Sequence, residues 1–527
     1  MLVFITFRMN FKVIKKADPP YALILLFVLL KTVLNLFAAP HFGYHRDELL
    51  HLALANHLDW GYKEVPPFIA LLAKLSLTFF GDTVFTARIF PTLAAGIIIW
   101  LTGLIAHELG GKRFAISLAC LTLIFSPAFI ASGYLFQPVV FDQLWWVLSI
   151  YLLIKYINTL NHSYLYWLGL ITGIGMLTKY TMAFFTVSLV VAILFTKQRK
   201  LLFTKHVFGA VLVALILFLP NIIWQFQHHF PVITHMKALQ KQQLDYISPQ
   251  NFIRQQLTVN GVALFIWLAG FVFLLFSNRL QKFRFLAFAY LLIFIFLLKM
   301  NGKNYYLFGA YPMLFAAGGF GFEQLIKVRH FVLRAFVTAL FTLPNLILLP
   351  LLLPVLPLKQ TLATIKLDSQ HIPSMRFAIT WEDQKQHPLT QDYADMLGWE
   401  EMVAASAKIY NSLSAEEKAH TAIIADNYGE AGAFERFGLK YHLPEVVCLN
   451  SSFALWAPEN LSAKTIIYVS DDKDVSDLKT VAGSLKLMYE VTDSLAREAG
   501  TGIFLLKDVK PGLNQIYRHS LLKTRTQ

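Results

Sequence analysis

Long apolar segments separated by short polar loops occupy the first two thirds of the chain. A helix needs about 20 apolar residues to cross a bilayer. By this measure the sequence predicts about eleven transmembrane helices and then a tail with a different pattern. The predicted spans are 21–39, 84–106, 113–133, 139–158, 164–178, 181–196, 206–223, 259–277, 284–299, 304–322 and 331–355.

The tail after residue 358 has short apolar runs of strand length between amphipathic stretches. The runs "TAIIAD", "VVCLN", "KTIIYVS", "LMYEV" and "GIFLLK" are typical of buried strands, and 398–413 and 427–442 are typical of helices. No glycine-rich nucleotide loop occurs in this tail. We therefore predict two domains, a transmembrane domain over 1–358 and a soluble α/β domain over 359–527.

Composition and charge agree with this division and add an orientation. Only 15% of the residues are charged, against about 25% in soluble domains. The net charge of +14 is concentrated before residue 360, in short loops rather than in a surface for nucleic acid. Positive loops mark the cytoplasmic side of a membrane protein. The clusters that fall on one side are Lys12, Lys15 and Lys16; Lys112 and Arg113; Lys197, Arg199, Lys200 and Lys205; Arg279, Lys282 and Arg284; and Lys327, Arg329 and Arg334.

This orientation places the loop 40–83, the loop 224–257 and the tail outside, which in a bacterium is the periplasm. The first of these loops contains "HRDELLHLALANHL", whose apolar spacing predicts an amphipathic helix on the membrane surface. Asp47 and His51 are four residues apart and share a face of that helix, with Glu48 beside them. The turn "GYKEVPP" follows and presents Lys63.

Further ionisable and aromatic residues are predicted at the same outer level. They are Arg88, Asp142, Lys179, Lys303, Tyr305 and Tyr306. Charged residues in or beside membrane spans are costly and usually mark a functional path. An acid beside several lysines suits a site that holds a phosphate while a carboxylate accepts a proton. Asp47 and His51 could form a metal pair, but they lack a third ligand at a recognisable spacing, so the spacing disfavours a metal site.

The order of these motifs resembles a known family. "DELLHLALANHLDWGYKEVPP", "FGDT" and Arg88, then "QPVVFDQLWW" with Asp142, "GIGMLTKYT" with Lys179, and "GKNYYLFGAYP" with Lys303, follow the same order as in glycosyltransferase family 39. This family includes the protein O-mannosyltransferases and the aminoarabinose transferases that modify lipid A. The resemblance covers roughly residues 20–330.

The resemblance implies a membrane glycosyltransferase of the C type. It implies a polyprenyl-phosphate sugar as donor, inversion at the anomeric carbon, no cofactor and no metal. Asp47 is then the expected base, with Glu48 as its catalytic partner and His51 orienting groups around it. The acceptor is expected to be a glycolipid, lipid A, a polysaccharide or a protein at the outer face of the inner membrane.

The resemblance also implies a binding site for the donor. Lys179 and Lys303 are expected to face the leaving phosphate, with Arg88 and Lys63 behind them. Asp142, Tyr305 and Tyr306 are expected to bind sugar or phosphate. Two other functions compatible with the residues are a secondary transporter, which would place its charges near the membrane midplane, and a non-catalytic membrane assembly protein.

Overall fold

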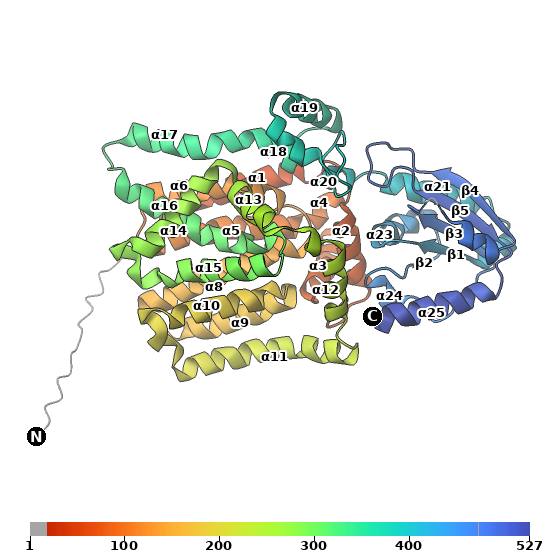
Figure 1. Ribbon diagram of the computed structural model, residues 1–527, viewed down its shortest axis with the longest axis horizontal. Helices are drawn as coiled ribbons and strands as arrows, with labels where there is room; N and C mark the ends of the chain where they lie inside the picture. The colour runs from red at the N-terminus through yellow and green to blue at the C-terminus, as the bar shows by residue number, and fades with distance from the viewer. Residues whose placement is uncertain (1–17, 473, 527) are drawn as a thin grey trace, which may run out of the picture.

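The computed structural model describes residues 18–472 and 474–526, so the predicted cluster of Lys12, Lys15 and Lys16 lies outside the described residues. Figure 1 shows a bundle of roughly parallel helices with a smaller α/β part at one end. The long helices of the bundle are α1 (Tyr21–Ala38), α5 (Ile89–Glu108), α6 (Arg113–Ile124), α8 (Pro138–Thr159), α9 (Ser163–Thr178), α10 (Thr181–Leu194), α11 (Lys205–Gln227), α14 (Leu264–Phe276), α15 (Phe285–Lys299), α16 (Tyr311–Leu325) and α17 (Phe331–Thr342).

Each of the eleven predicted spans coincides with one of these helices, but their lengths differ. In the described residues, five segments are long and apolar enough to cross a membrane as one helix: α1, Val84–Glu108, α8, α11 and Phe331–Leu352. Pro249–Thr258 and Gly261–Phe276 form a sixth if they count as one span, and they are bent by 94°. The others are shorter, so the number of membrane crossings stays a prediction.

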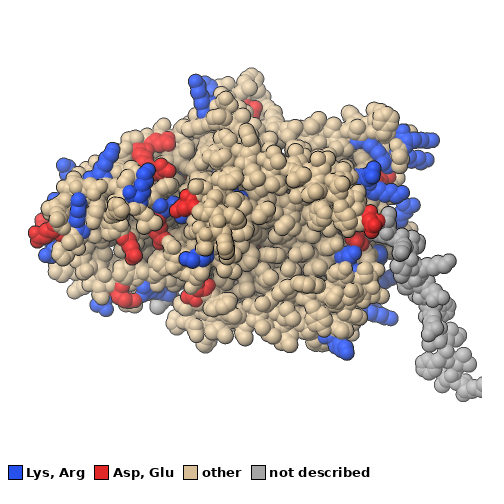
Figure 2. All heavy atoms as spheres, turned by 180° about the vertical axis from the view of Figure 1, so that it is seen from behind, with Lys and Arg blue, Asp and Glu red and all other residues tan. Residues whose placement is uncertain are grey.

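The surface of the bundle is apolar where a soluble protein would be polar. Val33 and Phe37 on α1 and Phe208 on α11 have exposed fractions of 64%, 60% and 75%. Figure 2 shows a broad band over the bundle with few charged residues, Lys and Arg at the end far from the α/β part, and mixed charges on the α/β part. An apolar band of this extent around helices long and apolar enough to cross a bilayer suits contact with lipid, so the chain is an integral membrane protein.

The loop 40–83 differs from its prediction. It contains α2 (Arg46–Ala53), followed by the apolar helix α3 (Phe68–Phe80) and the single turn α4 (Val84–Ala87). The prediction that α2 lies on the membrane surface is wrong, because residues 48–53 are all buried. One side of α2 meets the bundle and the other meets the α/β part, so its polar residues face protein rather than water.

The remaining connections of the bundle are short helices. α7 (Pro127–Ala131) links α6 to α8, and α18 (Leu349–Leu352) ends the bundle. α12 (Pro231–Gln242) and α13 (Pro249–Thr258) lie in the predicted outer loop 224–257. After α18, α19 (Leu358–His371) and α20 (Gln391–Ala394) share a core with Ala38, Ile130 and Tyr134, so this stretch packs on the bundle and not on the sheet.

The α/β part has one five-stranded sheet, in the order β2-β1-β3-β5-β4. The strands are β1 (Thr421–Ala425), β2 (Val446–Val447), β3 (Thr465–Ser470), β4 (Ser484–Glu490) and β5 (Gly502–Lys507). β2, β1 and β3 are parallel, and β5 pairs antiparallel with both β3 and β4. The five strands predicted from the sequence coincide with these, apart from shifts at their ends.

Helices cover both faces of this sheet. The helices of this part are α21 (Trp399–Asn411), α22 (Ala415–Ala419), α23 (Tyr428–Phe437), α24 (Phe453–Trp456) and α25 (Gly512–Thr526). Successive strand side chains point to opposite faces. Ile467 and Val469 therefore join the core with α21 and α23, while Ile466 shares a second core with Tyr517 and Leu521 of α25. The first core continues into the bundle, which fixes α23 against α2.

Candidate active site

Glu48 lies in a closed pocket made by distant parts of the bundle. Its carboxylate accepts two hydrogen bonds from Arg88, Nε to Oε1 at 3.1 Å and Nη2 to Oε2 at 2.8 Å. The backbone N–H groups of Phe136 and His45 each donate one more, both at 2.9 Å. Neither side chain of the pair is exposed to solvent. Glu48 also closes a capping box at the start of α2, so it fixes where that helix begins.

Arg88 is fully occupied by this arrangement. Besides Glu48, it donates to the carbonyl oxygens of Ala39 at 2.9 Å, His41 at 3.4 Å and Gly43 at 2.9 Å. A guanidinium with this set of acceptors holds the loop before α2 in place. The structure therefore separates Arg88 from the lysines with which the sequence had grouped it, and binding of the donor by Arg88 stays untested.

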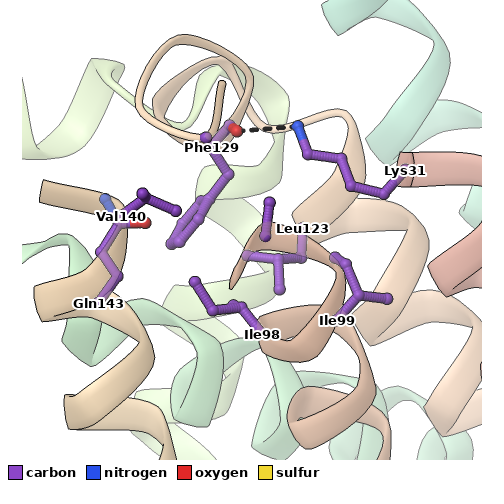
Figure 3. A pocket seen from close by; sticks show the side chains of 9 residues that line it. Lys31, Ile98, Ile99, Leu123, Phe129, Val140 and Gln143 are labelled. Atoms are coloured by element: carbon purple, nitrogen blue, oxygen red, sulfur yellow. Dashed lines mark hydrogen bonds between the residues drawn. The ribbon is translucent and has the colours of Figure 1, made fainter. Parts of the chain in front are cut away.

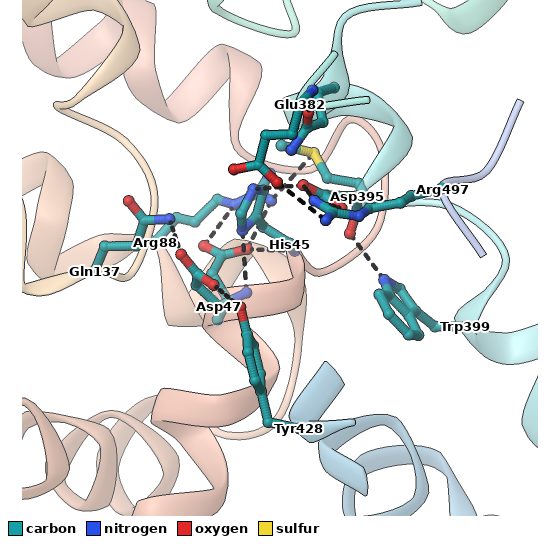
Figure 4. Close-up of polar contacts among 12 residues, drawn as sticks. His45, Asp47, Arg88, Gln137, Glu382, Asp395, Trp399, Tyr428 and Arg497 are labelled. Carbon is teal, nitrogen blue, oxygen red and sulfur yellow. Dashed lines mark hydrogen bonds and ion pairs between the residues drawn. The ribbon is translucent and has the colours of Figure 1, made fainter. Parts of the chain in front are cut away.

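Asp47, the residue before Glu48 on α2, faces the other way. The Gln137 side chain donates to Oδ2 at 3.0 Å, and the Tyr428 hydroxyl donates to Oδ1 at 2.9 Å. Figure 4 shows Asp47 between these two side chains, one from the start of α8 and one from α23. Burial raises the pKa of Asp47, but His45, His51, the Tyr428 hydroxyl and Arg46 lower it by more, so it lies below the usual value. The carboxylate is therefore ionised at neutral pH.

His51 interacts electrostatically with Asp47, and both His51 and Lys63 are held by other groups. The ring Nδ1 of His51 is 3.1 Å from the carbonyl oxygen of Phe136. Lys63 donates through its ammonium to the carbonyl oxygen of Thr524 in α25. Its neighbour Glu64 accepts hydrogen bonds from the backbone and hydroxyl of Ser452. The turn predicted to present Lys63 is thus also a contact with the α/β part.

A second cluster joins the remaining predicted residues. Asp142 accepts hydrogen bonds from Trp146 Nε1 at 3.0 Å and Thr181 Oγ1 at 2.7 Å, and it attracts Lys179. The ammonium of Lys179 lies 4.7 and 4.5 Å from the ring centroids of Tyr305 and Tyr306. These distances are those of cation–π contacts. Asp142 therefore has the partner that a carboxylate in an apolar segment requires.

Lys303 connects the two clusters. Its ammonium is 6.0 Å from the Tyr305 ring, and it interacts electrostatically with both Lys179 and Asp47. Asp47 also interacts electrostatically with Tyr305. The structure thus brings together an ionised carboxylate and two lysines that come from separate segments of the chain. Within the described residues, no group of three His, Cys, Asp or Glu side chains could hold a metal ion.

Sequence reasoning missed the residues that the α/β side contributes. Besides Tyr428, His45 Nε2 lies 3.8 Å from Asp395, whose carboxylate also meets Arg497 at 3.4 Å. Arg497 continues to Glu382 at 3.2 Å. Figure 4 shows this row of charges beside Asp47. One signal was present in the sequence: Gly429 and Gly432, three residues apart, mark a helix face suited to close packing.

A small closed cavity lies elsewhere, inside the bundle. Lys31, Ile98, Leu123, Phe129 and Gln143 are among the residues that line it (Figure 3). The Lys31 ammonium donates to the carbonyl oxygen of Phe129 at 3.0 Å. The lining is mostly aliphatic and includes neither carboxylate cluster, so the cavity is separate from the candidate site.

Comparisons with known proteins agree with this geometry. Residues 64–224 match the family model described as dolichyl-phosphate-mannose-protein mannosyltransferase. The chain superposes on ArnT from Cupriavidus metallidurans bound to undecaprenyl phosphate, with a TM-score of 0.60 and 12% identity, over 92% of this chain and 98% of that one. The chain has the C-type glycosyltransferase fold. The predicted resemblance and fold class are therefore confirmed.

Two further solved structures are similar to this chain. The apo form of the same ArnT gives a TM-score of 0.59 at 12% identity, over 92% of this chain and 97% of that one. An oligosaccharyltransferase from Archaeoglobus fulgidus gives 0.48 at 12% identity, over 85% and 69%. A comparison with curated protein sequences finds no match.

Proposed function

We propose that this chain is an inverting glycosyltransferase that moves a sugar from a polyprenyl-phosphate donor to an acceptor. The observation that carries the proposal is the ionised carboxylate of Asp47 facing Lys303, within a fold shared with a protein that binds undecaprenyl phosphate. A lipid-linked donor would reach this site sideways from the membrane. No nucleic acid or cofactor takes part in the proposed reaction.

Asp47 is the proposed base. The acceptor group attacks the anomeric carbon while the bond from that carbon to the phosphate oxygen breaks on the opposite face, which inverts the centre. Asp47 takes the proton that the acceptor loses. An ionised aspartate can do this because its oxygens each have a second lone pair beside the one that Gln137 or Tyr428 occupies.

Lys179 and Lys303 are the proposed partners of the leaving phosphate. Negative charge grows on that phosphate as the bond breaks, and fixed cations in a site shielded from water stabilise it. Asp142 and the faces of Tyr305 and Tyr306 hold Lys179 in place. Tyr305 and Tyr306 are also in reach to bind the sugar or the phosphate.

The other predicted residues receive supporting roles in this proposal. Glu48 and Arg88 position the start of α2, so we assign them to positioning rather than to a direct part in the reaction. His51 orients groups around Asp47. Lys63 contributes positive charge at the edge of the site while it anchors the turn to α25.

The proposed location is the bacterial inner membrane, with residues 1–358 as the transmembrane domain and 359–527 as a periplasmic domain. The donor then lies in the outer leaflet. The acceptor is a glycolipid, lipid A, a polysaccharide or a protein on that side. The Lys and Arg residues at the end of the bundle opposite the α/β part support this orientation (Figure 2).

Mass spectrometry of co-purified lipids tests the proposal. The full chain is purified as wild type, as Asp47→Asn and as Asp59→Asn, a control in the same loop. We expect Asp47→Asn to retain a polyprenyl-phosphate sugar, whereas wild type and Asp59→Asn carry free polyprenyl phosphate or nothing. Well-folded proteins that all carry only ordinary phospholipids would contradict the donor assignment and favour a transporter.

A further inference from the structure

The α/β part approaches Asp47 through a helix contact that only glycine permits. A Cβ atom on Gly432 would lie 2.8 Å from the backbone carbon of Leu49, and one on Gly429 would lie 2.6 Å from the side chain of Arg46. Both distances are shorter than real contacts, so larger residues would force α23 away from α2. The two glycines share one face of α23, and that face sets how close Tyr428 comes to the base.

Tyr428 is fixed at this contact by more than its hydroxyl. It is the first residue of α23, whose start is held by a capping box between Asn427 and Glu430. The guanidinium of Arg46 lies 4.7 Å from the centroid of the Tyr428 ring. The ring is therefore held by its helix and by a cation on its face, and the hydroxyl has a defined direction toward Oδ1 of Asp47.

We propose that Tyr428 is a positioning residue for the base, so that the α/β part is a component of the catalytic centre and not only a cover over it. This inference rests on the proposed function. Gln137 from the bundle holds one carboxylate oxygen and Tyr428 from the α/β part holds the other. The carboxylate plane is set by these two donors, and the free lone pairs point to where the acceptor must dock.

The hydroxyl of Tyr428 also favours the ionised form of Asp47. A donor that hydrogen-bonds a carboxylate stabilises its charged state and lowers its pKa. Without this donor the pKa of Asp47 rises. Asp47 then becomes protonated at a higher pH than in wild type. The other titratable or charged groups that face Asp47 are His45, Arg46 and His51 on or beside α2, Asp392 and Asp395 near α20, and Lys303 and Tyr305 after α15.

The experiment compares Tyr428→Phe with wild type, Asp47→Asn and Tyr410→Phe. Tyr410 lies in α21 beside Lys418 and serves as the matched control. Each full-length protein is purified in detergent and incubated with a lipid extract of bacterial inner membranes. Release of undecaprenyl phosphate is followed by mass spectrometry over a range of pH.

We expect Tyr428→Phe to release undecaprenyl phosphate about tenfold more slowly, as fits loss of a hydrogen bond to a charged group. We also expect the acid limb of its pH–rate profile to move to higher pH, a change that a merely structural role would not produce. Tyr410→Phe should match wild type. If Asp47→Asn is inactive but Tyr428→Phe keeps the wild-type rate and profile, the role of Tyr428 is wrong and the proposed function stands.

A second measurement does not depend on turnover. A carbodiimide with glycine ethyl ester labels carboxyl groups in their protonated form, and peptide mass spectrometry reports labelling of Asp47. We expect the pH of half-maximal labelling to be higher in Tyr428→Phe than in wild type. Equal values would overturn the inference. If labelling shifts but no protein releases undecaprenyl phosphate from the extract, the proposed function fails instead.

Discussion

Asp47 and Glu48 are adjacent on α2, yet they face different regions of the molecule. Glu48 faces the bundle, where four hydrogen bonds, two of them from the Arg88 guanidinium, saturate it away from solvent. Asp47 faces the α/β part and the lysines, and accepts only from two neutral side chains. The same chemical group is saturated in one region and keeps free lone pairs in the other, because the surroundings decide which lone pairs are occupied.

The largest expected effect comes from breaking the Glu48 side of this comparison. Arg88→Met removes the cation and leaves a buried carboxylate without its partner, which costs about 3–5 kcal/mol. We expect this loss of stability to lower the denaturation midpoint in detergent, measured by tryptophan fluorescence. Asp47→Asn should change the midpoint little, because a neutral amide fits beside Gln137 and Tyr428.

Two controls make this prediction specific. Arg254→Met removes an exposed cation and should leave the midpoint unchanged. Adding Glu48→Leu to Arg88→Met removes both members of the pair, and we expect it to restore part of the stability. An Arg88→Met protein as stable as wild type would mean that Glu48 has no structural role.

A smaller effect is expected where α23 meets α2. Gly432→Val places two methyl groups against the backbone of Leu49, and overpacking of this kind costs about 2–3 kcal/mol. The change also moves Tyr428 away from Asp47, so release of undecaprenyl phosphate should fall together with the denaturation midpoint. Gly512→Ala is the control, because a Cβ there meets nothing. Normal stability and activity in Gly432→Val would show that the close contact is dispensable.

Local patterns predicted the elements well. Runs such as 502–507 became strands, and each apolar segment became a helix, because hydrophobic length and periodicity are local properties of the chain. The importance of the segment around Asp47 was also visible, since charge beside a membrane span is rare. These features do not depend on where distant residues lie.

The partners of the two carboxylates could not be predicted in the same way. Glu48 and Arg88 are 40 residues apart, and Asp47 and Tyr428 are 381 residues apart, so no spacing links them. The amphipathic pattern of α2 was assigned to a membrane surface because its polar face gave no sign that another part of the chain covers it. Tertiary contacts, and not periodicity, decide these environments.

Glu435 on α23 offers the smallest test, since it is a half-buried carboxylate with no guanidinium partner among the described residues. Burial and the charge of Glu445 raise its pKa to about 7, against the hydrogen bond from Asn56. The folded state thus favours protonated Glu435, and this contribution to stability is lost as pH rises through about 7. Glu435→Gln should therefore lose less stability than wild type between pH 5 and 8, by about 1 kcal/mol. His57 lies 3.9 Å away, so the difference between the two proteins reports Glu435 together with its coupling to His57. Denaturation midpoints at each pH measure this difference in stability, with the exposed Glu490→Gln as control. If the midpoints of wild type and Glu435→Gln change with pH in parallel, Glu435 stays ionised, as Glu48 does.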